Sequence, residues 1–217
     1  MSKRTEKSSK LDQALYGFLE ELDSGRNLTI IGIDEVGRGS LAGPLTVAAV
    51  SLPLATRISG LNDSKKLSAA RREQLSQQIL QIARSYSIID LEASEIDRFG
   101  IAEAVRRGMK NALEAVAVQT GTPDIVLVDG RPLGIHTCEQ AIIKGDAKVA
   151  SIAAASILAK THRDALMIDY SKEYPCYGWH SNKGYGSAEH IAAIKEHGLS
   201  LLHRRSFCNG ILQETLF

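Results

Sequence analysis

The stretch TIIGIDEVGRGSLAGPLTVAAV, residues 29–50, decides how this chain folds. It opens with an apolar run at residues 29–33, and a second apolar run follows at residues 45–52. β-Branched side chains are enriched in strands, so both runs are predicted to form a hairpin-like pair of β-strands. Carboxylates and a glycine-rich loop lie between the two runs. The stretch therefore predicts a strand pair that presents acidic and glycine residues at one end.

Two acidic residues, Asp34 and Glu35, follow the first run, where we expect the strand to end. Neighbouring residues of a strand point to opposite faces. Both carboxylates are therefore expected to reach one site only if the strand bends or bulges, which the following glycines favour. A solvated acidic loop is the alternative, and it is the usual fate of an isolated Asp-Glu pair.

Gly37, Arg38 and Gly39 form a segment in which backbone N–H groups can approach a ligand beside a guanidinium. Such a segment is typical of a phosphate-binding nest. Its spacing excludes a Walker loop and a dinucleotide-binding fingerprint. Because divalent metals bridge carboxylates to phosphates, the acids and the glycines together predict a metal and phosphate site.

A length of 217 residues suits one large domain, or one domain with a small appendage. The composition, 44% hydrophobic and 24% charged, is that of an ordinary globular protein. The net charge of +1 argues neither for nor against a nucleic-acid partner. The cysteines, Cys138, Cys176 and Cys208, fit no zinc pattern or disulfide framework, so a cytoplasmic location is expected. No apolar run is long enough for a membrane span.

Strands and helices are predicted along the rest of the chain from hydrophobic periodicity and capping residues. The predicted strands are residues 85–91, 124–128 and 139–143, and the predicted helices are residues 11–23, 68–84, 101–118, 148–170 and 187–197. This pattern is typical of an α/β fold.

Asp129 directly follows the apolar strand at residues 124–128 and precedes a glycine. Ligands gather at the carboxyl ends of strands in α/β sheets, which favours a functional role, although an Asx turn is an alternative. Asp146 lies near the start of the helix at residues 148–170, where an acid can simply complement the helix dipole. It is nevertheless another acid at the boundary of an element.

Residues 174–186, YPCYGWHSNKGYG, concentrate aromatic and basic side chains. They suit stacking on a sugar or base beside a phosphate contact. A packed loop anchored by Tyr177 and Trp179 is the alternative. Further on, His203, Arg204 and Arg205 are interpreted as a basic surface patch.

These residues carry a resemblance to a known family. DEVGRG at residues 34–39 and LAGP at residues 41–44 resemble the opening signature of ribonuclease HII. Further blocks of that family follow in its order: NDSK at 62–65, LVDG at 127–130, KGD at 144–146, AASILAK at 154–160, NKGYG at 182–186 and HRRSF at 203–207. Departures from the family pattern are Val36, Ser40 and Leu199, and none removes a carboxylate.

The resemblance implies a ribonuclease H-like α/β fold: a five-stranded mixed sheet flanked by helices, with a small helical C-terminal region. We expect an N-terminal extension at residues 1–28, a catalytic core at 29–173 and a substrate-binding region and tail at 174–217. The implied activity is endonucleolytic cleavage of the RNA strand of RNA–DNA hybrids. It includes nicking 5′ of ribonucleotides embedded in duplex DNA, which leaves 5′-phosphate and 3′-hydroxyl ends.

The resemblance also implies a role for each matching residue. The metal-binding and catalytic carboxylates would be Asp34, Glu35, Asp129 and Asp146. The substrate-binding residues would be Gly37, Arg38, Gly39, Ser64, Lys65, Lys183 and Tyr185. Clustered acids repel one another and attract divalent cations, and Mn²⁺ or Mg²⁺ would support hydrolysis by two metal ions.

Other functions remain compatible with the residues alone. Another ribonuclease H-fold nuclease, such as a DNA junction resolvase, would also use clustered acids. A metal-dependent phosphatase or a nucleic-acid-binding module are further alternatives. Separately, the terminal residues QETLF, Gln213 to Phe217, resemble a peptide that docks on bacterial sliding clamps, although an apolar tail folded onto the domain is an equal alternative.

Overall fold

The computed structural model describes residues 15–17, 21, 28–53 and 57–213. A five-stranded mixed sheet lies at its centre, with the strand order β3-β2-β1-β4-β5. β1 is antiparallel to β2 and parallel to β4. The strands are β1 Ile30–Val36, β2 Leu45–Ser51, β3 Ser85–Leu91, β4 Ile125–Asp129 and β5 Glu139–Ile142. The predicted α/β class and the hairpin-like pair of β1 and β2 are confirmed.

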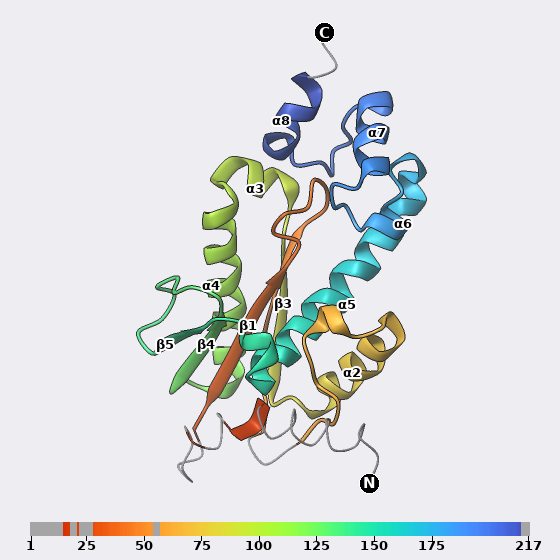
Figure 1. Ribbon diagram of the computed structural model, residues 1–217. Helices are drawn as coiled ribbons and strands as arrows, with labels where there is room; N and C mark the ends of the chain where they lie inside the picture. The colour runs from red at the N-terminus through yellow and green to blue at the C-terminus, as the bar shows by residue number, and fades with distance from the viewer. Residues whose placement is uncertain (1–14, 18–20, 22–27, 54–56, 214–217) are drawn as a thin grey trace.

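Helices cover both faces of the sheet, with α4 on one face and α5 on the other (Figure 1). The helices are α2 Ala69–Ile82, α3 Ala93–Phe99, α4 Ile101–Thr120, α5 Ala150–Glu173, α6 Trp179–Asn182, α7 Ala188–His197 and α8 Arg205–Gln213. Short 3₁₀ turns occur at Ser64–Lys66, Gly145–Ala147 and Pro175–Tyr177. The helix α3 was not predicted. Of the predicted helix at residues 11–23, only residues 15–17 and 21 lie within the described residues, and they are helical.

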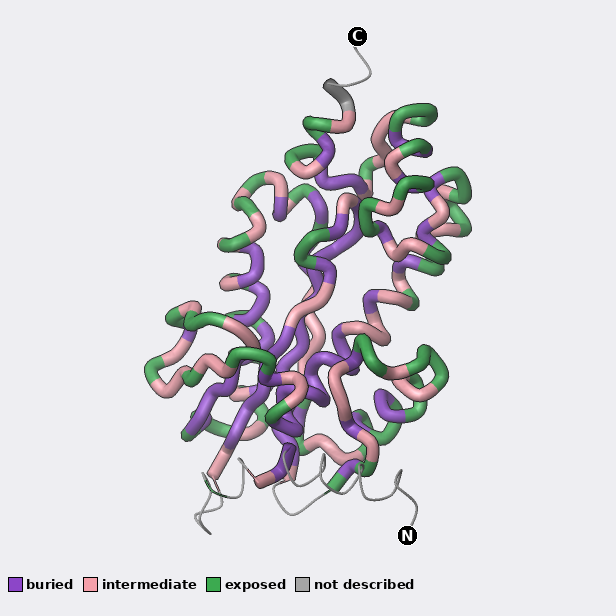
Figure 2. Tube along the Cα trace, in the orientation of Figure 1, coloured by how far each residue is buried: buried purple, intermediate pink, exposed green. Residues whose placement is uncertain are grey.

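The alternation of side chains along β1 explains why both faces of the sheet are buried. Ile31 and Ile33 belong to the core beneath α4, whereas Ile30 belongs to the core beneath α5 and α2. A strand that is covered on both faces reads as a continuous apolar run, as this stretch does. Figure 2 shows the buried trace running through the strands and the helix faces that meet them.

α5 approaches β1 unusually closely, and this contact brings the helix beside the acids of β1. A Cβ atom at Gly32 would lie 2.5 Å from the backbone nitrogen of Ile152. The first half of α5 is rich in buried alanine, which permits this approach. The close packing places later residues of α5, including Ser156, along the same face as Asp34.

The expected bulge at the acids is absent. Asp34 and Glu35 lie inside β1 and pair in unbroken register with Ala48 and Val47 of β2. On the other side, however, the pairing of β1 with β4 ends at Ile33. Because β1 continues beyond its parallel neighbour, side chains from both of its faces can reach around the open edge. Of the bend or bulge that was expected, the bulge is absent, and the early end of β4 brings both acids to one site without it.

The C-terminal helices pack around a third hydrophobic cluster, at the end of the molecule shown uppermost in Figure 1. Trp179 and Tyr177 are buried members of this cluster. The interpretation of residues 203–205 as a surface patch was wrong, because His203 and Arg204 are buried and only Arg205 is exposed. Their polar groups are satisfied by backbone carbonyls and other buried side chains, which the sequence alone does not reveal.

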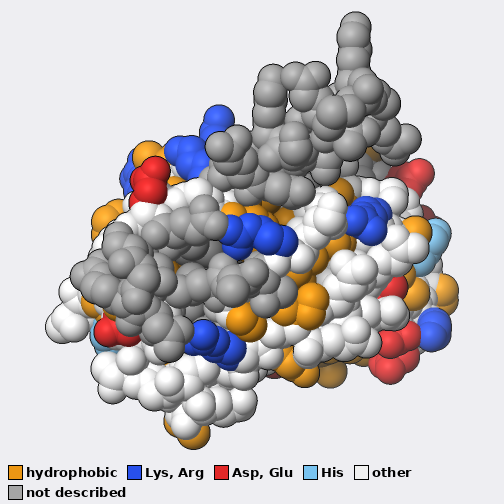
Figure 3. All heavy atoms as spheres, turned by 90° about the horizontal axis from the view of Figure 1, so that it is seen from below, with side chains coloured by type: hydrophobic (Ala, Val, Ile, Leu, Met, Phe, Trp, Pro, Cys, Tyr) orange, Lys and Arg blue, Asp and Glu red, His pale blue; other side chains and the backbone are white. Residues whose placement is uncertain are grey.

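The surface carries charges of both signs. Seen from below, Lys and Arg side chains lie at separate places on the molecule, and acidic side chains lie nearer its edges (Figure 3). This scatter agrees with the net charge of +1. Within the described residues, no helix combines the length and the apolarity that a membrane span requires.

Candidate active site

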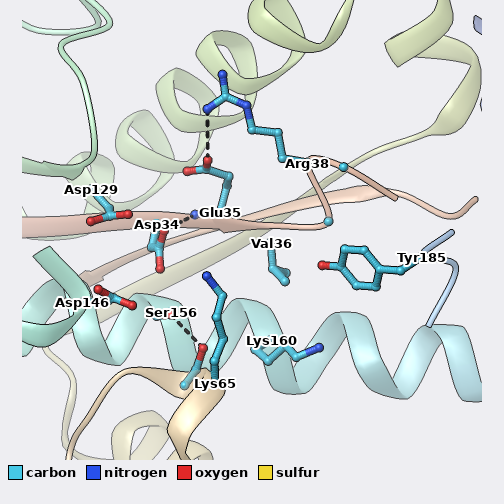
Figure 4. A pocket seen from close by; sticks show the side chains of 13 residues that line it. Asp34, Glu35, Val36, Arg38, Lys65, Asp129, Asp146, Ser156, Lys160 and Tyr185 are labelled. Carbon is cyan, nitrogen blue, oxygen red and sulfur yellow. Dashed lines mark hydrogen bonds and ion pairs between the residues drawn. The ribbon is translucent and has the colours of Figure 1, made fainter. Parts of the chain in front are cut away.

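The carboxylates near the ends of β1 and β4 lie in one cleft of about 510 Å³ beside α5 (Figure 4). Every predicted site residue except Lys183 lines this cleft. Its lining is Asp34, Glu35, Val36, Gly37, Arg38, Gly39, Ser64, Lys65, Asp129, Asp146, Ser156, Lys160 and Tyr185. Strand ends, two 3₁₀ turns, a glycine loop, one helix and the segment that carries Tyr185 thus supply a single concave site.

Asp34 is the most buried of the four carboxylates, with only 6% of its surface exposed. Its Oδ1 accepts a 2.7 Å hydrogen bond from the backbone N–H of Glu35. Burial raises the pKa of Asp34 well above its usual value, and the negative charges of Glu35 and Asp129 raise it further. A hydrogen bond from Ser156 opposes this rise. The carboxylate is therefore held in place by hydrogen bonds, while burial and the neighbouring acids disfavour its charged form.

Glu35 points to the other side of β1, toward Arg38, as Figure 4 shows. Its Oε1 lies 3.6 Å from Nη1 of Arg38. Burial raises the pKa of Glu35, the Arg38 charge lowers it, and Asp129 raises it. Glu35 and Asp129 also border a second cleft of about 520 Å³ on the α4 side, which contains Arg131. The acids thus stand at the edge of β1 between two clefts.

Asp129 ends β4, and its Oδ1 accepts a 2.6 Å hydrogen bond from the backbone N–H of Gly145. This contact ties the strand to the turn that carries Asp146. Burial raises the pKa of Asp146, the charges of Asp63 and Asp129 raise it further, and Lys65 opposes them. Asp146 lies in its own 3₁₀ turn, and the following helix begins only at Ala150. Asp146 is therefore positioned by the turn and not by the first turn of α5.

The chemistry of the cleft fits a hard divalent cation, because carboxylate oxygens are the ligands that Mg²⁺ and Mn²⁺ prefer. In the described part of the chain, no three acidic, histidine or cysteine side chains already converge around a single point. The acids are nevertheless close enough to raise one another's pKa, as Asp34 shows. An ion between them would neutralise this repulsion and draw the carboxylates inward.

The glycine loop adopts a conformation that only glycine favours. Gly37 has a φ of 89°, and a Cβ there would lie 2.9 Å from Cδ of Arg163. Arg38 and Gly39 are exposed at the cleft. The loop backbone is thus free to face a ligand on one side while α5 supports it from the other.

Ser64 and Lys65 reach the cleft from the 3₁₀ turn at Ser64–Lys66. The Oγ of Ser64 is buried and lies 3.0 Å from Oγ of Ser156, whereas Lys65 is exposed. Lys183 does not line the cleft, and its Nζ instead donates to the carbonyl of His180. Its predicted phosphate contact stays a prediction.

The aromatic segment at residues 174–186 divides into two roles. Tyr177 and Trp179 are buried and stacked, with ring centroids 5.1 Å apart, so they serve as packing anchors. Tyr185 is 37% exposed and lines the cleft. Its ring centroid lies 5.4 Å from Cζ of Arg163 and 5.9 Å from Nζ of Lys160. Tyr185 is therefore the aromatic ring that this segment places at the cleft, where it could stack on a substrate.

Ser156 and Lys160 line the cleft, although no role was predicted for either. They are four residues apart on α5 and therefore lie on the same face of the helix. Their spacing within an otherwise alanine-rich face was the signal that could have identified them. Ser156 supports Asp34, and Nζ of Lys160 lies 2.6 Å from Asp164.

The sequence matches the family model of ribonuclease HII over residues 31–210. The chain is 49% identical over 181 residues to ribonuclease HII of Desulfitobacterium hafniense, covering 83% of this chain and 68% of that protein. It is 43% identical over 202 residues to ribonuclease HII of Enterococcus faecalis, covering 93% of this chain and 78% of the relative.

Solved structures show the same fold. Ribonuclease H2 from Pyrococcus horikoshii OT3 superposes with a TM-score of 0.73 at 24% identity, covering 87% of this chain and 99% of the other. The RNase HII of the PCNA:RNase HII complex from Archaeoglobus fulgidus superposes with a TM-score of 0.67 at 26% identity, covering 82% and 94%. Bst-RNase HIII in complex with Mn²⁺ gives 0.65 at 20% identity, covering 87% and 70%.

The matched residues include all four carboxylates, the glycine loop and Tyr185, which the fold collects in one cleft. The chain therefore belongs to the ribonuclease HII family and is a metal-dependent endonuclease of the ribonuclease H type, acting on RNA–DNA hybrids.

Proposed function

We propose that this enzyme also nicks duplex DNA on the 5′ side of a single embedded ribonucleotide, by hydrolysis with two divalent ions. The observation that carries the proposal is that the carboxylates, the glycine loop and Tyr185 line one continuous cleft. A site that reads a single ribonucleotide needs catalytic groups and a detector of the 2′-hydroxyl within one nucleotide of each other. The acids and the glycine loop of this cleft are our candidates for these two roles.

Asp34, Glu35, Asp129 and Asp146 would hold the ions. Bound Mg²⁺ or Mn²⁺ would supply an activated water and stabilise the leaving 3′ oxygen, which leaves 5′-phosphate and 3′-hydroxyl ends. Burial raises the pKa of Asp34, and repulsion from Glu35 and Asp129 raises it further; this supports the assignment, since a cation relieves that repulsion. Hydrogen bonds from Ser156 and from the backbone N–H of Glu35 would keep the Asp34 carboxylate oriented toward a bound ion.

The glycine loop would read the ribose. Only the 2′-hydroxyl distinguishes RNA from DNA at one position, so a group must contact it directly. Gly37 and Gly39 carry no side chain, so the backbone around Arg38 can approach the sugar closely. The exposed Arg38 guanidinium would meet the adjacent phosphate.

The nucleotide that follows the junction would stack on Tyr185. The ring is partly exposed, and Lys160 and Arg163 lie beneath it, which favours a stacked sugar beside a phosphate. Lys65 lines the same cleft from the 3₁₀ turn at Ser64–Lys66 and would contact a phosphate there. Ser64 would hold that turn against α5 through its hydrogen bond with Ser156.

The deciding experiment compares three duplexes: an RNA–DNA hybrid, a DNA duplex with one ribonucleotide, and an all-DNA duplex. Each is incubated with Mg²⁺, Mn²⁺ or EDTA, and the ends are mapped. We expect metal-dependent cleavage of the first two and an intact third. Cleavage of the hybrid alone would overturn the proposal, and cleavage of all-DNA would indicate a nuclease that does not read the 2′-hydroxyl.

The C-terminal tail, Gln213 to Phe217, is proposed to dock on a sliding clamp. Residues 214–217 lie outside the described residues. The support is the resemblance of QETLF to a clamp-binding peptide and the solved complex of a relative with PCNA. A chain ending at Leu212 should lose binding to a bacterial clamp while cleaving naked hybrid at the wild-type rate. Unchanged clamp binding would exclude this role.

A further inference from the structure

Two buried arginines lie beneath the glycine loop. Arg163 of α5 and Arg204, which precedes α8, each have 0% of their surface exposed. A buried guanidinium is normally paired with a carboxylate, because an unpaired charge is costly to remove from water. In the described part of the chain, neither arginine forms an ion pair, and their hydrogen bonds go to backbone carbonyls instead.

Arg163 joins the two halves of the substrate cleft. Its Nε donates to the Pro44 carbonyl at 2.8 Å and its Nη2 to the Ala42 carbonyl at 3.0 Å, both in the loop between β1 and β2. Its Nη1 donates to the Lys183 carbonyl at 2.9 Å, two residues before Tyr185. One planar fork therefore sets the distance between the glycine loop and the segment that carries Tyr185.

Arg204 holds the same loop from the opposite end. Its Nε and Nη2 donate to the Gly43 carbonyl at 3.1 and 2.9 Å. Its Nη1 donates to the carbonyl of Arg38 at 3.1 Å. The backbone N–H of Arg204 also donates to the Leu41 carbonyl at 2.8 Å. The N–H groups of residues 40–43 donate to the carbonyls of Gly37, Gly184 and Leu202, so residues 37–39 are the part of the loop that can face a ligand with its N–H groups.

Two glycines of this region leave no room for a side chain. A Cβ at Gly37 would clash with the side chain of Arg163, whereas one at Gly43 would clash with Sδ of Met167 and lie in ordinary contact, 3.4 Å, from Nη2 of Arg163. Both glycines have positive φ, at 89° and 81°. The loop conformation and the buried guanidiniums therefore depend on each other.

The charges of the two arginines stay in place at neutral pH. Burial lowers the pKa of both, and that of Arg204 falls to about 9, with Arg163 as a further cause. Arg204 therefore remains protonated at pH 7, and Arg163 keeps its charge because guanidinium groups hold their proton in proteins. Two positive charges thus lie under the loop without a paired carboxylate, in surroundings where water does not screen them. Such a field favours an anion on the exposed side of the loop.

We propose that Arg163 and Arg204 are positioning residues that shape the loop at residues 37–44 and add positive potential for the substrate phosphate bound there. The proposal rests on the proposed role of this loop in substrate binding. It assigns a function to two side chains that touch neither the carboxylates nor the solvent. The ligand class it implies is the phosphodiester backbone of the hybrid.

The test replaces each arginine by glutamine, which removes the charge, and by lysine, which keeps the charge but not the fork. Arg71→Gln is the matched control, because Arg71 also caps a backbone carbonyl, that of Ser59, but does not line the cleft. The kinetic constants kcat and KM for RNA–DNA hybrid cleavage are measured at low and high salt. The rise in Tm on adding Mn²⁺ reports on the carboxylates separately.

We expect Arg163→Gln to raise KM about tenfold or more at low salt, and to weaken the dependence of KM on salt, because a charge near phosphate is lost. Arg163→Lys should recover part of the KM and the salt dependence. The Mn²⁺-induced rise in Tm should match that of the wild type. Arg71→Gln should leave KM unchanged.

An unchanged KM in folded glutamine variants would overturn the proposal. The proposal would also be overturned if the glutamine variants lost both kcat and the Mn²⁺-induced rise in Tm, because that result would indicate general disruption of the site. If the glutamine variants do not fold, the lysine variants decide. Wild-type KM and salt dependence in a lysine variant would overturn the proposal that the planar guanidinium shapes the loop, because the charge would then be sufficient. Because the substrate is the hybrid, failure of the wild type to nick a single embedded ribonucleotide would count only against the proposed function.

Discussion

Asp129 and Gly145 are joined by a 2.6 Å hydrogen bond from the Gly145 backbone N–H to Oδ1 of Asp129. The bond connects the end of β4 to the turn that carries Asp146. Two acids from separate elements are thereby placed against one cleft. Their positions are coupled, so a change at one should displace the other.

Replacing Gly145 with alanine tests this coupling. A Cβ at residue 145 would lie 2.6 Å from Cδ1 of the buried Ile152 and 3.3 Å from Oδ1 of Asp129. Overpacking of this kind destabilises a protein by about 1–3 kcal/mol. We expect kcat for hybrid cleavage to fall by about tenfold, equivalent to about 1.4 kcal/mol in the barrier. Urea unfolding and single-turnover kinetics would measure the two effects.

Gly210→Ala is the control for that variant. Gly210 lies in α8, and nothing would meet a Cβ there within 4 Å. Alanine should stabilise this helix by about 0.5–1 kcal/mol and leave kcat unchanged. If Gly145→Ala also kept the wild-type kcat, the turn would not position the acids.

Much of the sheet was predictable because its strands are covered on both faces and read as apolar runs. The strand at residues 85–91 was predicted with the bounds observed for β3. α3 was missed because it follows β3 with only Glu92 between them. Its signal was local: Glu92 and Glu95 form a capping box at its start.

The end of β1 was predicted less well, for a physical reason. The sequence shows that Asp34 and Glu35 follow apolar residues, but it does not show where β4 stops. The acids reach one cleft because β4 pairs with β1 only as far as Ile33. Likewise, Arg204 was assigned to the surface because the carbonyls that bind it come from residues far away in the chain.

Gly32→Ala tests the close packing of α5 on β1. The new Cβ would lie 2.5 Å from the backbone nitrogen of Ile152, and a helix backbone cannot rotate away as a side chain can. We expect a loss of about 3 kcal/mol in the free energy of unfolding, at the upper end of the overpacking range. Chemical denaturation measures it directly.

Gly108→Ala in α4 is the matched comparison. There a Cβ would meet the ends of the Leu91 and Val47 side chains at 2.8 Å, and not a backbone. The gain in helix propensity, about 1 kcal/mol, should offset much of the strain. An equal loss in both variants would mean that the approach of α5 to Gly32 is not especially tight.

Asp34→Asn tests the carboxylate cluster. Asparagine keeps an oxygen that can accept the hydrogen bond from Glu35 but removes the charge. Without metal, the variant should be more stable than the wild type, because the repulsion from Glu35 and Asp129 is lost. With Mn²⁺ at about 100 times its Kd, the wild type should gain about 2.7 kcal/mol, and the variant should gain less.

Cleavage by Asp34→Asn should fall by roughly 10³-fold, about 4 kcal/mol in the barrier. Asp169→Asn is the control, since Asp169 is an exposed residue of α5 paired with Lys172. Thermal melts with Mn²⁺ or EDTA and hybrid cleavage assays provide the measurements. Full turnover by the Asp34 variant would exclude this residue from the proposed metal site.

His203 predicts how stability depends on pH. Its Nδ1 accepts a hydrogen bond from the Ser200 backbone N–H at 3.0 Å, so its proton lies on Nε2. Nε2 then donates to Nε2 of His190 at 3.1 Å, an atom that also accepts from Nε1 of Trp179 at 3.0 Å. His190 in turn donates from Nδ1 to the carbonyl of Tyr185 at 2.9 Å. The network requires both histidines to be neutral.

Burial lowers the pKa of His203 to about 4, and the neighbouring His190 contributes to the shift. In the unfolded chain the His203 side chain is therefore protonated below about pH 6.5, whereas in the folded protein it is protonated only below about pH 4. This contribution is constant above pH 6.5, and stability is lost as the pH falls from 6.5 toward 4. In Tm measurements across this range, His203→Gln should lose less stability on acidification than the wild type. The exposed His180→Gln should follow the wild-type curve, and parallel curves for wild type and His203→Gln would contradict the buried neutral network.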